Sequence, residues 1–213
     1  MKTKTPLILK LCLFSLIAIV AMLTKPHYSL AGGRPGSDPI DQLKQTVDQL
    51  TTIMGDNSLA SKDRRMDRRQ KIIQVVDHRF NFKLMSKLAL GKHWEEIGPN
   101  YKELFSSLFA DLLKNTYIRR VEAYSDEQVV FSDQVIKKNV AMVRSSFLKN
   151  NASLSIDYKL RKEGSQWMVF DVIIEGASII KQYRRQFSTI LKKESIGELI
   201  ARLKEKVEAQ EQI

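Results

Sequence analysis

The hydrophobic and polar positions change their period about halfway along the chain. In the first half, apolar residues recur every three or four positions, which is the spacing of one face of a helix. This spacing predicts four helices, over residues 39–53, 62–80, 82–90 and 99–117. Proline at position 39 favours the first turn of the first helix, and Gly91 is a typical stop for the third.

The second half contains segments with the two-residue period of strands. Leu154, Ile156, Tyr158 and Leu160 alternate with polar residues, which is typical of a strand with one wet face. Similar segments at 127–136, 139–148 and 167–174 are joined by short turns, and short turns favour antiparallel pairing. Two further helices, over 178–192 and 195–210, close the chain. The order predicts an α+β fold with a four-stranded antiparallel sheet and helices before and after it.

The last predicted strand is apolar at almost every position. Simple alternation puts Trp167, Val169 and Ile173 on one face, and the other face receives the following residues: Met168, Phe170, Val172 and Ile174. A strand that is apolar on both faces must be covered on both. Either helices wrap both faces of the sheet, or one face looks into an apolar space.

The first thirty-one residues differ from the rest. Lysines 2, 4 and 10 precede an uncharged apolar run over 11–23, and small residues follow at Ser29 and Ala31. This pattern predicts a secretory signal peptide cleaved after Ala31, and with it export, a short lead-in at 32–37 and one domain over 38–213. The alternative is a retained membrane anchor, although the run is shorter than the roughly 20 apolar residues that usually span a bilayer.

Cleavage would remove Cys12, the only cysteine, so no disulfide or thiol chemistry is expected. It would also lower the formal net charge from +11 to +7, because residues 1–31 carry four lysines and no acid. A positive surface suits anionic partners such as lipid head groups or acidic protein faces, and solubility alone would also explain it. The arginines near residue 65 are interleaved with acids, so nucleic-acid binding is not expected.

The sequence contains few side chains that could catalyse a reaction or bind a metal ion or cofactor. His78 and His93 lack metal-ligand spacing, and neither a nucleophile motif nor a glycine-rich phosphate loop occurs, so no metal or cofactor is expected. The best acid/base candidates are Asp157, Asp171 and Glu175, and Asp171 stands out because it lies within an apolar strand. The alternative is that Asp171 pairs with Arg184 or Arg185, or caps nearby backbone. We therefore predict a protein that is not an enzyme.

Several motifs resemble one known family. The segment "W-x-V-F-D-V-x-x-E-G-x-S" at 167–178, followed by "Y-R-x-x-F" at 183–187, is similar to the toluene-tolerance, or MlaC, family of periplasmic phospholipid carriers. "LALGKHW" at 88–94, the helix at 101–117 and the strand "SLSIDYKL" also fit, so the resemblance spans roughly residues 38–207.

The resemblance implies a curved sheet of the NTF2 or cystatin type, wrapped by N-terminal and C-terminal helices around an apolar cavity for acyl chains. It implies a monomer that carries phospholipid between an outer-membrane lipoprotein–porin complex and an inner-membrane ABC transporter with an MCE-domain subunit. A hopanoid-associated subgroup shares the motifs, so the lipid class stays open. The alternative is a membrane-anchored periplasmic scaffold of similar fold without lipid transfer.

Residues expected to line the cavity come from the apolar faces of the helices, from the strand at 139–148 and from the last strand. They are Met85, Leu88, Phe105, Leu108, Leu112, Met142, Val169, Ile173 and Ile179. Tyr183 and Arg184 are expected at its mouth, where an arginine can bind a phosphate with two parallel hydrogen bonds. Ordinary core packing is the alternative for the apolar residues, and an ion pair with Glu175 or Asp171 is the alternative for Arg184.

Overall fold

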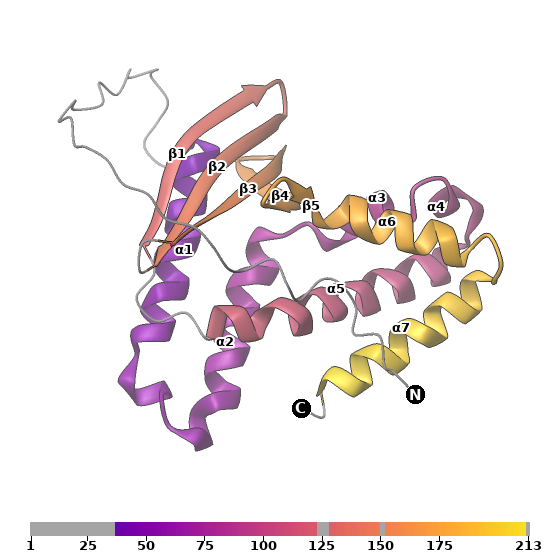
Figure 1. The fold of residues 1–213 in the computed structure, drawn as a ribbon, viewed down its shortest axis with the longest axis horizontal. Coiled ribbons are helices and arrows are strands. Elements are labelled where there is room, and N and C mark those ends of the chain that lie inside the picture. Colours follow the sequence, from indigo (N-terminus) through magenta and orange to yellow (C-terminus); the bar gives the residue numbers. More distant parts are fainter. Residues whose placement is uncertain (1–36, 123–127, 150–151, 212–213) are drawn as a thin grey trace. The chain divides into compact units, whose positions relative to one another are not determined.

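The structure, a computed structural model, describes residues 37–122, 128–149 and 152–211. All of these lie in one compact unit, Gly33–Ile213. The predicted signal peptide (1–31) and all of the predicted lead-in except Ser37 lie outside the described residues, so cleavage stays a prediction. The described residues form an α+β fold, as the sequence predicts (Figure 1).

The helices and strands follow the predicted order closely. The helices are α1 (Pro39–Gly55), α2 (Arg65–Arg79), α3 (Phe82–Leu90), α4 (His93–Glu96), α5 (Pro99–Glu122), α6 (Ile179–Ile190) and α7 (Ile196–Glu211), with the short 3₁₀ turns η2 (Asn57–Leu59) and η3 (Lys62–Arg64). The strands are β1 (Gln128–Lys137), β2 (Val140–Lys149), β3 (Ala152–Glu163), β4 (Gln166–Ile174) and β5 (Ala177–Ser178).

The sheet has five strands in the order β1-β2-β3-β4-β5, and every neighbouring pair is antiparallel. The prediction of four strands is therefore wrong by one. After β4 the chain turns at Glu175 and Gly176, both with positive φ, and Ala177–Ser178 pairs back onto the end of β4. A strand of two residues has no alternating pattern, so periodicity could not reveal it.

A bulge at Phe170 overturns the simple alternation expected for β4. Val169 pairs with Leu160, but the next pair along is Asp171 with Lys159, so Phe170 is the extra residue. Beyond it the parity reverses, and Val172, opposite Tyr158, shares the face of Val169. Ile173 therefore lies on the opposite face from Val169, because partners across a ladder point the same way.

Two apolar clusters hold the fold together. The sheet cluster lies between the sheet and α1; its buried members are Leu43, Ala141, Val143, Leu160, Trp167 and Val169. The helix cluster lies mainly among the later helices; its buried members are Met85, Ala89, Leu90, Trp94, Phe105, Phe109, Leu112, Leu113, Phe170, Ile179, Ile180, Phe187, Leu199, Ile200, Leu203 and Val207. The two clusters meet at a boundary where Phe80 and Val172 pack against both of them. We call this boundary the seam.

A buried polar network fixes α1 and α2 to the start of β4. The Arg79 guanidinium donates to Thr46 Oγ1 (2.9 Å), Gln42 Oε1 (2.8 Å) and the Trp167 carbonyl (3.0 Å). Gln42 Oε1 also accepts from the Trp167 amide at 2.8 Å, and Gln42 Nε2 donates to the Ser165 carbonyl at 3.0 Å. Burial lowers the pKa of Arg79. The buried side chains of Gln42 and Thr46 and the guanidinium of Arg79 therefore satisfy one another and the backbone of β4, as burial requires.

Two helix starts show how local signals succeed and fail. Ser195 and Glu198 form a capping box at the start of α7, as their three-residue spacing in the sequence favours: the Glu198 carboxylate accepts from the Ser195 amide, and Ser195 Oγ accepts from the Glu198 amide at 3.3 Å. Ser61, in contrast, does not cap α2. Its carbonyl accepts from the Arg64 amide in a 3₁₀ turn, and α2 begins only at Arg65.

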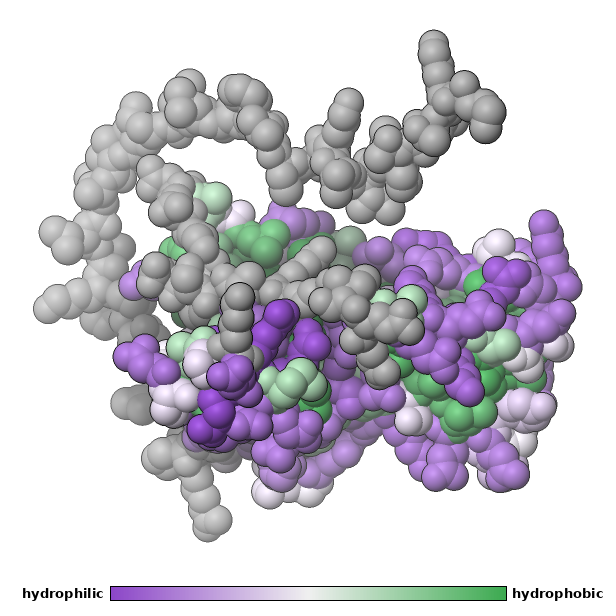
Figure 2. Space-filling model, turned by 90° about the horizontal axis from the view of Figure 1, so that it is seen from below, coloured by the Kyte–Doolittle hydropathy of each residue, from purple (hydrophilic) through white to green (hydrophobic). Residues whose placement is uncertain are grey.

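The face in Figure 2 is mostly hydrophilic over the described residues, with apolar patches between the charged side chains. Exposed apolar side chains on α5 include Tyr101 and Leu104, which are 46% and 47% exposed. None of the helices within the described ranges combines the length and apolar character needed to cross a membrane.

Candidate functional site

Most of the predicted lining residues meet in the helix cluster. Met85, Phe105, Leu112 and Ile179 are buried members, and three others pack against the cluster while staying partly exposed: Leu88, Leu108 and Tyr183. Residues from three helices, far apart in sequence, therefore gather as expected. Whether they line a lipid cavity or a filled core stays a prediction.

The three predicted strand residues are dispersed. Val169 belongs to the sheet cluster, whereas Met142 and Ile173 belong to neither cluster. Met142 pairs with Lys159, which in turn pairs with Asp171, so these residues share the sheet face that also carries Ile173. Val169 and Ile173 therefore do not face one common space, and the bulge at Phe170 is the reason.

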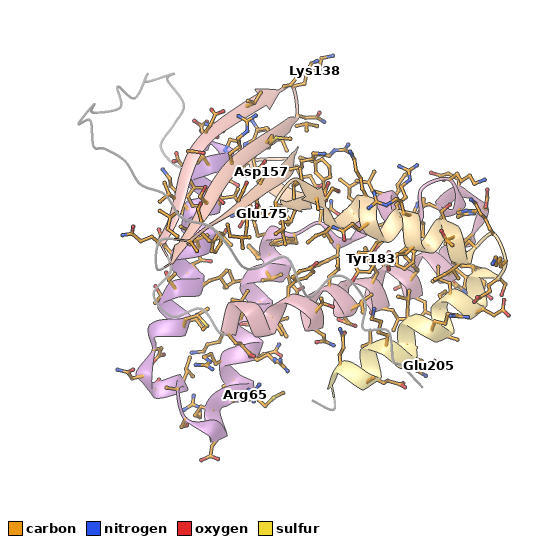
Figure 3. All side chains as sticks on the ribbon, in the orientation of Figure 1. Arg65, Lys138, Asp157, Glu175, Tyr183 and Glu205 are labelled. Atoms are coloured by element: carbon orange, nitrogen blue, oxygen red, sulfur yellow. The ribbon has the colours of Figure 1, made fainter. Side chains whose placement is uncertain are left out.

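An aromatic group forms the centre of the helix cluster. The Phe109 ring centroid lies 5.6 Å from that of Phe105, 5.0 Å from that of Tyr183 and 5.5 Å from that of Phe187, mostly edge to face. Tyr183 lies on the side of α6 that faces α5 (Figure 3). Burial, with a contribution from Tyr117, raises the pKa of Tyr183, while a hydrogen bond with the Thr116 side chain lowers it. Tyr183 is therefore neutral at physiological pH and packs with the core.

Arg184 lies against Gly91, at the end of α3. A Cβ atom on Gly91 would stand 2.7 Å from Arg184 Nε, closer than packed atoms approach. Gly91 has φ 60° and ψ −125°, a backbone conformation open to glycine and strained for other residues. Two of the motifs that carry the family resemblance, "LALGKHW" and "Y-R-x-x-F", thus meet here. Within the described residues Arg184 makes no ion pair with Glu175 or Asp171.

Gly91→Ala is expected to lower the free energy of unfolding by about 1–3 kcal/mol, because φ at this position is positive. The Arg184 side chain can move, so the double variant Gly91→Ala/Arg184→Ala should recover only a small part of that loss. Gly98→Ala is the matched control, since a Cβ there meets nothing within 4 Å. Urea unfolding followed by circular dichroism measures all three, and equal midpoints for Gly91→Ala and Gly98→Ala would contradict this account.

Asp171, which the sequence singled out among three acid/base candidates, has a structural role. It is buried, and its carboxylate accepts from Ser178 Oγ at 2.7 Å and from the Ile180 amide at 3.2 Å. Ser178 Oγ in turn accepts from the Lys181 amide at 3.0 Å, and Lys159 Nζ lies 3.7 Å from the carboxylate. Asp171 and Ser178 therefore cap α6 together. The partner cation is Lys159, whereas the sequence suggested Arg184 or Arg185.

The seam between the two clusters involves residues that the lining prediction did not include. Phe80 and Val172 pack against both clusters. The Asn81 amide donates to the Val169 carbonyl at 2.8 Å, which holds the α2–α3 connection along β4. Tyr158 lies beside Val172 on the next strand, and burial raises its pKa to about 12. Phe80 is the last residue of the helical pattern at 62–80, but only the bulge at Phe170 brings Val172 to this face.

Two further observations concern possible ligand-binding sites on the surface. An open hollow of about 430 Å³ lies on α6 and is lined by Arg185, Gln186, Thr189 and Ile190, none of which was predicted as lining. Among the residues that the structure describes, no group of three or more His, Cys, Asp or Glu side chains is placed to hold a metal ion.

Comparison with known families identifies the chain. Residues 44–205 match the family model described as MlaC protein, which is most of the chain. The chain belongs to the MlaC family. The intermembrane phospholipid transport system binding protein MlaC of Haemophilus influenzae is a relative, 22% identical over 131 residues. The alignment covers 59% of this chain and 61% of that protein.

One solved structure resembles this chain both in fold and in sequence. The phospholipid-binding protein from Ralstonia solanacearum, in complex with a phospholipid, superposes with a TM-score of 0.69 and 28% sequence identity. The match covers 79% of this chain and 96% of that one, so nearly the whole neighbour has a counterpart here. The resemblance inferred from the motifs is confirmed at the level of family and of the α+β fold.

Proposed function

We propose that this MlaC-family protein binds a phospholipid through its acyl chains and carries it across the periplasm, without catalysing a reaction. The observation that carries the proposal is the likeness, over almost all of the neighbour's length, to a protein that was solved with a phospholipid. The transfer would run between an outer-membrane lipoprotein–porin complex and an inner-membrane ABC transporter with an MCE-domain subunit. Export by the predicted signal peptide would place the protein in the right compartment.

The energetics explain why such a carrier needs an apolar space. Each methylene group moved from lipid into water costs about 0.8 kcal/mol, and a diacyl lipid has on the order of thirty, so unshielded crossing costs tens of kcal/mol. A carrier must nearly match the bilayer in apolarity, because a much tighter site would not release its lipid.

The seam between the helix cluster and the sheet cluster is the place that we propose for the acyl chains. Half-buried apolar side chains gather beside it, among them Val172, Ile174 and Phe80. Apolar side chains that are neither exposed nor fully packed are suited to contact a hydrocarbon chain. Bulges at Ser132 on β1 and at Phe170 on β4 bend the sheet, which supports a concave wall on that side.

Native mass spectrometry of the purified protein tests the proposal directly. We expect a species heavier than the polypeptide by the mass of one or more lipids, and organic extraction should identify a phospholipid or, alternatively, a hopanoid. The intact mass also records whether residues 1–31 are removed, and a retained leader would favour the anchored-scaffold alternative. Lipid-free protein alone, from cells rich in lipid, would contradict the proposal.

Val172→Arg locates the site within the fold. If acyl chains occupy the seam, the variant should lose bound lipid while its melting temperature changes by only a few degrees. If the seam is dry core, a buried unpaired charge should unfold the protein instead. Ile136→Arg, at a strand position that is 46% exposed, is the control and should keep both lipid and stability.

A further inference from the structure

Two neighbouring helices carry cations and no acid. From Phe82 to Lys92, α3 and its following turn contain Lys83, Lys87 and Lys92. From Ile179 to Lys193, α6 and its following turn contain five cations: Lys181, Arg184, Arg185, Lys192 and Lys193. All eight side chains are exposed. The other long helices, such as α7, mix acids with cations, so the segregation is specific to this pair.

Packing brings the two sets of cations onto adjoining surfaces. The buried sides of α3 and α6 meet in the helix cluster, and Arg184 lies against Gly91, beside Lys92. Within the described part of the chain, Lys87 is the one member of the eight in an ion pair, with its Nζ 2.8 Å from Glu95 Oε1. The pairs Lys83–Lys87 and Lys181–Arg185 place like charges one helical turn apart, which destabilises an isolated helix. An anionic partner would offset that repulsion.

The same surface lacks the apolar anchors of a protein interface. Such interfaces usually depend on exposed aromatic or aliphatic side chains at their centre. The large apolar side chains that are well exposed lie on α2, α5 and strands β1, β2 and β3, and none of those described is on α3 or α6. Cations without an apolar anchor fit a layer of lipid head groups, where each lysine or arginine adds to the attraction.

We propose that the outer surfaces of α3 and α6, with their eight cations, dock the protein on a bilayer rich in anionic lipid. This docking goes beyond lipid carriage, because it needs only the outside of the two helices. The hollow on α6 lies on this surface, and the Arg185 guanidinium at its wall can bind a head-group phosphate through two parallel hydrogen bonds.

Vesicle co-sedimentation tests the docking. The protein is purified with the N-terminus that it keeps in the cell, as established by intact mass, and is mixed with vesicles of equal parts phosphatidylglycerol and phosphatidylcholine. We expect binding at about 0.05 M NaCl that is lost at about 0.5 M, and none to phosphatidylcholine alone, because salt screens exposed charges. Lys181→Gln/Arg185→Gln should lower the affinity for the anionic vesicles at least about tenfold.

The matched control removes the same charge elsewhere. Lys204→Gln/Lys206→Gln changes two exposed lysines of α7, a helix of mixed charge, and should leave binding within about twofold. Equal losses from both double variants would show that only net charge matters and would overturn the proposal. So would a lack of binding to anionic vesicles, which would direct attention to an acidic protein surface. Circular dichroism confirms folding, and Lys192→Gln/Lys193→Gln is a second variant for the same comparison.

Lipid carriage and docking are separable in these experiments. Native mass spectrometry of Lys181→Gln/Arg185→Gln should show the same bound lipid as the unmodified protein, because both side chains point outward. Loss of vesicle binding with lipid retained identifies docking alone. A protein without bound lipid that still requires Lys181 and Arg185 for vesicle binding would leave docking standing and would contradict carriage.

Discussion

Phe109→Ala is expected to lower the free energy of unfolding by about 3–5 kcal/mol. Phe109 has no exposed surface, and its ring contacts those of Phe105, Tyr183 and Phe187. Truncation removes the buried ring and leaves a cavity that α5 and α6 cannot close without moving. Because domains are stable by only about 5–15 kcal/mol, a large part of the folded state's margin would be lost. Urea unfolding followed by circular dichroism measures the change.

Two control variants on α5 test whether the loss of stability comes from the cavity left by the buried ring. Phe109→Leu keeps most of the volume and should lose less than half as much stability. Tyr101→Ala removes an aromatic ring from the same helix at a site that is 46% exposed, and should cost less than about 1 kcal/mol. A Phe109→Ala protein as stable as Tyr101→Ala would mean that the aromatic group is loosely packed. In that case the helix cluster, rather than the seam, would be the better place for a lipid chain.

Asp171→Ala is expected to destabilise the protein by about 2–4 kcal/mol. The change removes an acceptor from the Ile180 amide and from Ser178 Oγ, and it leaves Lys159 without its carboxylate. The first turn of α6 would then have an unsatisfied buried amide, and the helix dipole would lose a favourable negative charge at its positive end. Thermal melting and urea unfolding of the purified variant measure the loss.

The controls for Asp171 separate its charge from its place on the sheet. Asp171→Asn keeps an oxygen acceptor for the Ile180 amide and removes the charge, so an intermediate loss is expected. Asp157→Ala alters a half-buried acid on the same sheet face and should cost well under half as much, because Asp157 has no comparable capping role. If Asp171→Ala retained its stability but lost all cellular function, the capping account would be wrong and a catalytic role would have to be reconsidered.

The strands show which parts of the fold could be predicted. The strict alternation of Leu154, Ile156, Tyr158 and Leu160 with polar residues correctly placed β3, because such a period of two is typical of a strand. The burial of β3 does not alternate in the same way, since Leu154 is 42% exposed and only Leu160 is fully buried. The sequence located β4 correctly, but the predicted faces are wrong for the residues beyond the bulge at Phe170. Residues 167–174 are apolar at both parities, so nothing in the sequence could indicate where a bulge would reverse them.

The candidate site depended even more on contacts between distant residues. The helical residues Met85, Phe105, Leu112 and Ile179 could be grouped in advance, because each lies on the apolar stripe of its helix. Val172 was missed at the seam, because its face depends on the register between β3 and β4. Arg184 was expected at a cavity mouth, and its contact with Gly91 could not be read from two motifs that lie ninety residues apart.

The sequence by itself determined the order and type of most elements, the need to cover both faces of β4, and the family. These follow from the backbone period of each segment and from motifs that are continuous in the chain. Only the tertiary structure decided which residues share the seam, that Asp171 caps α6, and that the cations of α3 and α6 form adjoining surfaces. Register, bulges and helix packing depend on the fit between side chains far apart in the sequence, and no local pattern contains that information.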